Sequence, residues 1–294
     1  MRKIIPKISH LKYLYNHPLA IGLRLKIFSR YFSFHILNRH NDEVIIPFLG
    51  NKLIIKKGQG GQGNYFTYLN DYEEMLFLAH YLKSSDIFID AGANVGSYSM
   101  LAAVTKFSTV HAFEPNSIFF KILEKNILIN NLQNKVTAHY CALGEKYGSV
   151  HLINKGALSH ISHDNTRDSE KVELKRLDSI VTHAHVMKID VEGYEHNMLI
   201  GSEKIMENSN LNVIIIEMAS YNRYDSSDHK VHSLITNYGF SPIFYNPKTR
   251  MIKDKKQYTK GGKGWWNVIY IRDRDLVLDR INSSKKIKVN GRWY

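Results

Sequence analysis

The stretch DIFIDAGANVG, from Asp86 to Gly96, decides the fold of this 294-residue chain. Its apolar run Ile87–Asp90 predicts a buried strand, and the residues from Ser97 onward predict a helix. Gly92 and Gly96 therefore fall in a strand-to-helix turn, which is where open α/β sheets bind their ligands. The acidic step AFEP at 112–115 follows the next predicted strand.

Working outward, short β-rich runs alternate with helical stretches from about residue 51, as in a mostly parallel sheet. Strands are predicted at Ile87–Asp90, Thr109–Phe113, Val136–Ala142, Val186–Asp190, Val213–Glu217, Pro242–Tyr245 and Trp266–Ile271. Helices are predicted at Ser97–Thr105, Asn116–Asn130, Gly193–Met206 and Asp228–Tyr238. The last two strands are joined by a basic loop that needs no helix, so they predict a closing antiparallel hairpin.

The pattern predicts one α/β domain with basic flanks. We expect an N-terminal helical extension over 1–50, the α/β domain over 51–275 and a basic tail over 276–294. Within the domain, an insert at 148–177 contains two strand-like pieces around a polar, turn-rich segment. This insert is expected to be a lid or substrate loop.

The formal charge of +13 is concentrated in two segments. Residues 1–40 hold eight Lys or Arg and no acid, and 248–263 hold seven Lys or Arg against Asp254. The remainder is near neutral, so the total does not by itself indicate a nucleic-acid-binding body. With one cysteine, Cys141, and no apolar run of about 20 residues, we expect a cytoplasmic protein.

The first 40 residues mix apolar and basic side chains, including Leu23, Ile27, Phe28 and Phe32. One interpretation is an amphipathic helix that makes peripheral contact with an anionic membrane. The other is a helix packed on its own domain with a solvated basic face. The sequence leaves both open.

The glycine turn and the acidic step together predict a cofactor site. The turn has the spacing Gly-x-x-x-Gly rather than G-x-G-x-x-G, which argues against a pyrophosphate and favours a ligand such as S-adenosylmethionine. Glu114 ends the second strand, where its two acceptor oxygens could receive both ribose hydroxyl protons. Alone, Glu114 could equally be an acid at a helix start, and Asp90 a cap for the turn.

The run HVMKIDVEGYEHNML places Lys188, Asp190 and Glu192 at the end of the fourth parallel strand. Alternation along a strand points Asp190 and Glu192 to one side, as a pair that could orient a hydroxyl, take its proton or hold a divalent ion. The plainer interpretation is that Glu192 caps the helix beginning near Gly193. A metal is not favoured, because the sequence shows no third ligand.

In order, DIFIDAGANVGSYSMLAA, VHAFEPN, NILINN, VTAHYCALG, LDSIV, KIDVEGYEHNMLIG and VIIIEM resemble the motifs of the FkbM family of methyltransferases. The resemblance implies a class I, Rossmann-like α/β fold, S-adenosylmethionine as cofactor, and methyl transfer to a hydroxyl of a sugar in a polysaccharide, glycolipid or glycosylated metabolite. It implies Asp190 and Glu192 as active-site acids. The cofactor contacts that it implies are Asp90, Gly92, Ala93, Asn94, Gly96, Ser97, Glu114, Pro115, Ala142, Leu143 and Asp190.

The proton acceptor is less well defined by the sequence. His160, in the insert, is the best histidine candidate because its ordinary pKa near 6.5 suits proton removal at neutral pH, and Asp190 is next.

Three other functions remain to be weighed. The basic flanks and aromatic residues such as Trp265, Trp266 and Tyr270 would suit a nucleic-acid methyltransferase. Against this, enzymes that methylate the amino groups of bases commonly have an Asn/Asp-Pro-Pro-aromatic turn after the fourth strand, and this chain has IDVEG there. The second alternative function is a non-catalytic binding module, and the third is a nicotinamide-dependent oxidoreductase.

Overall fold

The computed structural model describes residues 8–38, 40–153, 160–162, 169–219, 228–255 and 265–294, without the side chains of residues 8, 160–162, 219 and 265. Its centre is an eight-stranded sheet with the order β13-β12-β14-β11-β10-β3-β4-β5. The five strands from β11 to β5 run parallel, and β14 pairs antiparallel with both β11 and β12. The strands are β3 (Ile87–Ala91), β4 (Thr109–Phe113), β5 (Val136–His139), β10 (Val186–Ile189), β11 (Val213–Ala219), β12 (Ser241–Asn246), β13 (Met251–Asp254) and β14 (Trp265–Ile271).

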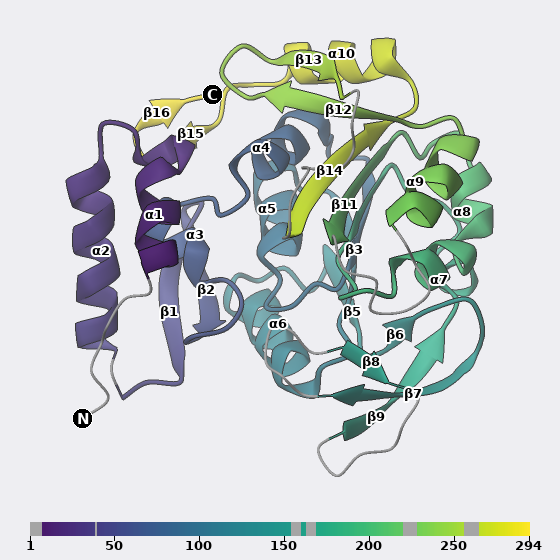
Figure 1. Ribbon diagram of the computed structural model, residues 1–294, viewed down its shortest axis with the longest axis horizontal. Coiled ribbons are helices and arrows are strands. Elements are labelled where there is room, and N and C mark those ends of the chain that lie inside the picture. The colour runs from purple at the N-terminus through teal and green to yellow at the C-terminus, as the bar shows by residue number, and fades with distance from the viewer. Residues whose placement is uncertain (1–7, 39, 154–159, 163–168, 220–227, 256–264) are drawn as a thin grey trace.

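Helices cover both faces of this sheet (Figure 1). One layer contains α4 (Tyr72–Tyr81), α5 (Ser97–Lys106) and α6 (Ser117–Ile129), and the other contains α7 (Glu195–Ile200), α8 (Glu203–Glu207) and α9 (Asp228–Asn237). Successive residues of β3 serve the two layers, since Phe88 belongs to the core with α4 to α6 and Ile89 to the core with α7 to α9. The strands are apolar on both faces because both faces are buried.

This arrangement confirms the class I α/β fold with its closing antiparallel strands. The predicted strand Val136–Ala142 is wrong in its second half, because Ala142 leaves the main sheet and pairs with Leu174 in a second sheet. The predicted helix Gly193–Met206 is interrupted at Gly201, which lies against the backbone of Gly144 and has no room for a Cβ. The basic loop after β12 contains a further strand, β13.

The insert forms most of the second sheet, whose order is β6-β9-β7-β8. Its strands are β6 (Ala142–Leu143), β7 (Gly148–Ile153), β8 (His160–Ser162) and β9 (Ser169–Lys175). The two strand-like pieces predicted in 148–177 correspond to β7 and β9. Leu152 of β7 packs with Ala142 and Tyr194, so this small sheet rests on the main domain.

The N-terminal segment packs on the domain as a helical pair and a hairpin. It comprises α1 (Ile8–Asn16), the short 3-10 turn η1 (Pro18–Ala20), α2 (Arg24–Leu37), β1 (Glu43–Phe48), β2 (Asn51–Lys56) and α3 (Gln62–Thr67). Ile27, Tyr31 and Phe34 of α2 are buried in the same core as α4 to α6. None of the helices in the described residues is long and apolar enough to span a membrane.

The residues expected to form a basic C-terminal tail, 276–294, contain regular secondary structure. They form α10 (Arg274–Ser283) and a hairpin of β15 (Lys288–Val289) and β16 (Arg292–Trp293). Val277 and Ile281, four residues apart, are buried against the core. This short apolar stripe was obscured by the surrounding charged residues.

A buried ion pair ties α10 to the sheet and yields a stability prediction. Asp86 is buried, and its Oδ2 accepts hydrogen bonds from Arg280 Nη1 at 2.6 Å and from the Lys83 amide at 2.8 Å. Asp86→Ala is expected to lower the free energy of unfolding by about 3–5 kcal/mol, because it leaves a partly buried guanidinium without its counter-ion. Denaturant unfolding would measure this, with the exposed Asp279→Ala on the same helix as control. Equal stability of the two variants would contradict it.

Candidate active site

A cleft runs along the carboxyl ends of β3, β4 and β10, as the parallel topology requires. It has two compartments that share Gly92, Asn94, Asp190 and Glu192 in their walls. The empty space between their walls, including space open to solvent, is about 670 Å³ in the first and about 980 Å³ in the second.

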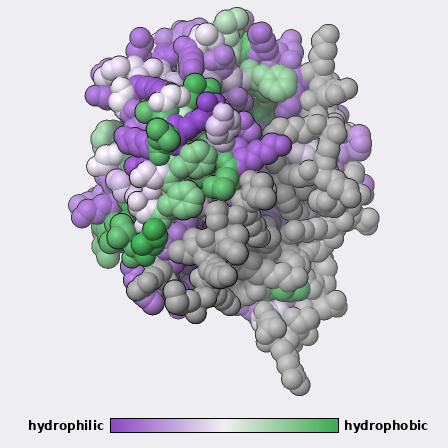
Figure 2. Space-filling model, turned by 60° about the vertical axis from the view of Figure 1, so that its left-hand side comes forward, coloured by the Kyte–Doolittle hydropathy of each residue, from purple (hydrophilic) through white to green (hydrophobic). Residues whose placement is uncertain are grey.

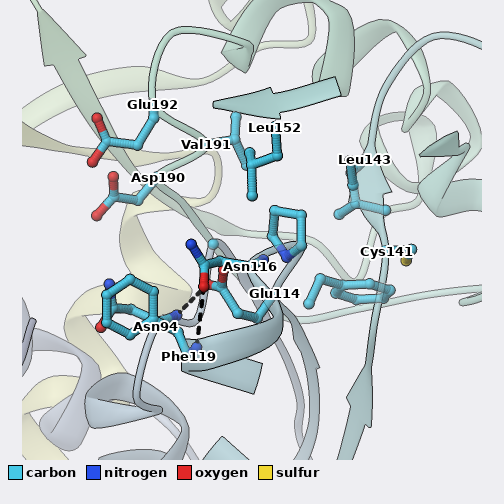
Figure 3. A pocket seen from close by; sticks show the side chains of 14 residues that line it. Asn94, Glu114, Asn116, Phe119, Cys141, Leu143, Leu152, Asp190, Val191 and Glu192 are labelled. Atoms are coloured by element: carbon cyan, nitrogen blue, oxygen red, sulfur yellow. Dashed lines mark hydrogen bonds between the residues drawn. The ribbon is translucent and has the colours of Figure 1, made fainter. Parts of the chain in front are cut away.

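The first compartment is apolar at one end and acidic at the other. Leu143 and Cys141 line one end, Asp190 and Glu192 lie together at the opposite end, and Leu152 lies beside Val191 between them (Figure 3). Glu114 lies between these ends. The cavity would therefore suit a ligand with a flat apolar group at one end and a polar group at the other.

Glu114 is the central acceptor of this compartment. Its Oε2 accepts the Asn94 amide at 2.7 Å and its Oε1 accepts the Asn116 amide at 2.8 Å (Figure 3). Burial raises the pKa of Glu114 to about 7, against the effect of these two amides, which lower it. Each oxygen keeps lone-pair capacity for one more donor, so the carboxylate can receive a pair of neighbouring hydroxyls.

The glycine turn is shaped by close backbone contacts. Gly92 has φ of +80°, and a Cβ there would lie 1.8 Å from the Asp190 carbonyl oxygen. Gly96 has φ of +88° and directly precedes α5, facing Leu123 of α6 rather than the cleft. The first glycine therefore brings β3 and β10 together at the cleft, whereas the second allows α5 and α6 to pack.

The second compartment is lined by a glycine-rich segment of sequence GQGGQG at 58–63, which is a loop that runs into the first residues of α3. Gln59, Gln62 and the glycines 60, 61 and 63 line it. Gly60 lies so close to Asn94 that an added Cβ would be 1.9 Å from Asn94 Oδ1. Asn94 Oδ1 is itself held by the Val95 amide at 2.8 Å. The loop and the glycine turn thus form one wall of the cleft.

Gly60→Ala is expected to weaken binding of a ligand in the cleft by about 10-fold, because Asn94, which lines both compartments, must move away. Titration with S-adenosylhomocysteine would measure the loss. Gly148→Ala is the matched control, since a Cβ at Gly148 meets nothing within 4 Å. Unchanged affinity in Gly60→Ala would show that the loop does not shape the site.

Three carboxylates meet where the compartments join. Asp190, Glu192 and Glu217 each offer an oxygen within 4.8 Å of the others. Glu217 follows the pair Ile189 and Ile216 in the parallel register of β10 and β11, which places it beside Asp190. A cluster of three carboxylates can bind a hydroxyl, share a proton or bind a cation.

Lys188 supplies positive charge beneath this cluster. The side chain is buried, and its Nζ lies 2.9 Å from Asp190 Oδ2 and 5.2 Å from the centre of the Tyr98 ring. Desolvation opposes its charge, but Asp190 and Glu217 outweigh that effect and raise the pKa of Lys188 to about 12. Lys188 is therefore a permanent cation in the floor of the cleft.

Glu217 has a strongly raised pKa, and Glu192 has a strained backbone conformation. Burial and the neighbouring Asp190 raise the pKa of Glu217 to about 10, so that its carboxyl is neutral at pH 7. Glu192 has φ of +54°, which costs a non-glycine residue of order 1 kcal/mol. Strain of this kind is concentrated at functional sites.

Most sequence-predicted site residues lie in this cleft. The first compartment holds Gly92, Asn94, Glu114, Pro115, Ala142 and Leu143, the second holds Asp90, Gly92, Ala93, Asn94 and Ser97, and Asp190 and Glu192 line both. Gly96 lines neither. His160 begins β8, but its side chain lies outside the described part of the chain.

Sequence reasoning missed Glu217 and the 58–63 loop. Glu217 was predicted only as the end of a strand, although the rule that selected Asp190, a carboxylate at the carboxyl end of a parallel strand, applies to it equally. The loop precedes the first parallel strand, and the density of glycines was its one signal. The expectation that no third carboxylate accompanies Asp190 and Glu192 was wrong.

Comparisons with known proteins relate the chain to a family and to solved structures. The first structure is methyltransferase FkbM from Methylobacillus flagellatus KT, at 18% identity and a TM-score of 0.45, over 71% of this chain and 52% of that one. The second is TYW2 of M. jannaschii in complex with AdoMet, at 19% identity and a TM-score of 0.43, over 79% and 87%. The third is the tRNA m1G37 methyltransferase of M. jannaschii, at 11% identity and a TM-score of 0.46, over 80% and 58%.

The chain thus spans about half the length of the first of these structures. No curated protein matches it at a significant level. The family model described as the methyltransferase FkbM domain matches residues 90–242, just over half of the chain and most of the cleft-forming elements. The chain belongs to the FkbM methyltransferase domain family.

Proposed function

We propose that the protein is an S-adenosylmethionine-dependent O-methyltransferase that methylates a sugar hydroxyl of a polysaccharide, glycolipid or glycosylated metabolite. The observation that carries this proposal is the layout of the cleft. A buried acceptor, Glu114, lies beside an apolar cavity, and the carboxylates of Asp190 and Glu192 lie where that cavity opens into the second compartment, with Glu217 next to them.

The residues of the cleft fit this cofactor. Glu114 would hold the ribose hydroxyls, with Leu143 and Cys141 beside the adenine, and the polar second compartment would take the amino-acid end. Among the described residues, Lys188 is the one Lys or Arg that lines either compartment, and it is paired with Asp190. This acidic lining favours a sulfonium and an ammonium group and opposes the pyrophosphate of a dinucleotide.

The bound cofactor supplies a methyl group already activated on a sulfonium. The chain has to align the acceptor hydroxyl, receive its proton and exclude water. As the new C–O bond forms and the C–S bond breaks, the hydroxyl proton passes to Asp190, with Glu192 orienting the acceptor. His160 stays an alternative proton acceptor.

The same acidity disfavours a nucleic-acid acceptor, because a phosphate backbone would have to approach the carboxylates of Asp190 and Glu192. It also bears on metals. Three carboxylates could surround a divalent ion, but the ammonium of Lys188 already provides a cation at this point. We therefore propose metal-independent transfer, and turnover should withstand EDTA.

A transfer assay with tritiated S-adenosylmethionine tests the proposal. A cell-envelope glycan extract and a pool of RNA and DNA would be offered side by side. Label that enters the glycan fraction and resists mild base would support sugar O-methylation. Label confined to nucleic acid would overturn the acceptor class.

A further inference from the structure

The outer face of α2 is apolar although it faces solvent. Ile27, Tyr31 and Phe34 point into the core, whereas Leu25 is 88% exposed and Ile36 is 60% exposed. Phe32 is also exposed, at 42%. An ordinary surface helix would place polar side chains at such positions.

These exposed residues form one stripe. At about 100° per residue, Leu25, Phe32 and Ile36 lie within about 40° of each other around the helix axis. Phe28, half-buried, borders the stripe, and Ile21 precedes it with 52% exposure. Figure 2, which brings this side of the molecule forward, shows hydrophobic side chains gathered in a band among hydrophilic ones.

The C-terminal hairpin extends this surface. Arg292 Nη2 donates to the Ile21 carbonyl oxygen at 2.7 Å, and Lys26 Nζ donates to Asn290 Oδ1 at 3.3 Å. These bonds hold the β15–β16 hairpin beside the start of α2, as Figure 1 shows. Trp293 of the hairpin is 62% exposed, with Lys288 Nζ over its ring. Tryptophan is enriched at membrane–water interfaces, and lysine is attracted to anionic headgroups there.

The two segments that form this surface are basic. The two segments that meet here, 8–38 and 284–294, contain no Asp or Glu. Their eight cationic side chains are Lys12, Arg24, Lys26, Arg30, Lys285, Lys286, Lys288 and Arg292. An apolar stripe flanked by lysine and arginine is complementary to acyl chains beneath anionic headgroups.

We propose that α2 and the β15–β16 hairpin form a docking surface for an anionic lipid bilayer. The charge argues against a second copy of the chain as the occupant, because a twofold pairing would oppose two acid-free basic segments. A bilayer with anionic lipids instead offers the opposite charge. The inference does not depend on the proposed methyl transfer.

Vesicle flotation with the full-length chain tests this surface. The chain should float with vesicles of phosphatidylcholine and phosphatidylglycerol, stay behind with phosphatidylcholine alone, and be released by high salt. Leu25→Ser with Phe32→Ser and Ile36→Ser should weaken binding at least 10-fold. Because these side chains are exposed, the triple variant should keep its thermal unfolding midpoint, which is measured alongside.

A matched triple variant controls for loss of exposed apolar surface elsewhere. Phe107, Ile118 and Leu128 are exposed to comparable extents on other elements, and their replacement by serine should leave vesicle binding within twofold. The proposal is overturned if the wild-type chain floats with neither vesicle, or if the α2 variant binds as well as wild type. It is also overturned if light scattering shows a dimer that the α2 variant dissociates.

Discussion

Glu114→Gln is expected to weaken binding of S-adenosylhomocysteine by about 100-fold, or about 2.7 kcal/mol. The carboxylate accepts amides from Asn94 and Asn116, one on each oxygen, and has to accept ribose hydroxyls as well. Glutamine replaces one acceptor oxygen with an NH₂ group that would face one of these amides. Isothermal calorimetry measures the loss, with Glu124→Gln on the exposed side of α6 as control.

The same residue predicts a pH dependence of binding. The pKa of Glu114 is raised to about 7 without ligand, and only the ionised form can accept every donor. Affinity for S-adenosylhomocysteine should therefore be maximal above pH 8 and fall about 10-fold for each pH unit below pH 7. Glu114→Gln should remove this slope. A variant that kept both wild-type affinity and the slope would show that Glu114 does not bind the cofactor.

Asp190→Asn is expected to reduce methyl transfer by about 1,000-fold, because it removes the carboxylate that receives the acceptor proton. The amide oxygen of asparagine can still accept the hydrogen bond from Lys188, so the fold and most of the affinity for S-adenosylhomocysteine should remain. The measurement is kcat with the acceptor identified by the transfer assay, alongside calorimetry and thermal unfolding.

Glu217→Gln is the matched control for that experiment. With its pKa raised to about 10, Glu217 is already neutral at pH 7, and glutamine is a neutral donor of similar shape. Turnover should change by less than about 5-fold. If Glu217→Gln instead lost activity as Asp190→Asn did, an ionised Glu217, as in a divalent-metal site, would have to replace the present account.

The central strands could be predicted because their residues carry local signals. Ile87–Asp90 and Thr109–Phe113 are short apolar runs bounded by turn residues, and the structure places β3 and β4 there. Ala142 shows the limit of local reasoning. It continues the same short run as Val136–His139, yet it pairs with Leu174, more than 30 residues later, and so belongs to another sheet.

The site could be predicted where it follows from one rule, that ligands bind at the carboxyl ends of parallel strands. Glu114 and Asp190 were found in this way. Contacts between distant segments could not be found, such as the approach of Gly60 to Asn94 and the contact of the C-terminal hairpin with α2. These contacts depend on the tertiary fold, which brings segments that are distant in the sequence next to each other. The local sequence pattern of either segment does not reveal its partner.

The most direct test of the central claim, a cleft built for S-adenosylmethionine, is calorimetric titration of the wild-type chain with S-adenosylhomocysteine and with NAD. The acidic lining around Asp190 and Glu192, and a turn that lacks the dinucleotide spacing, predict micromolar binding of S-adenosylhomocysteine and no detectable binding of NAD. Tight binding of NAD without binding of S-adenosylhomocysteine would contradict the account.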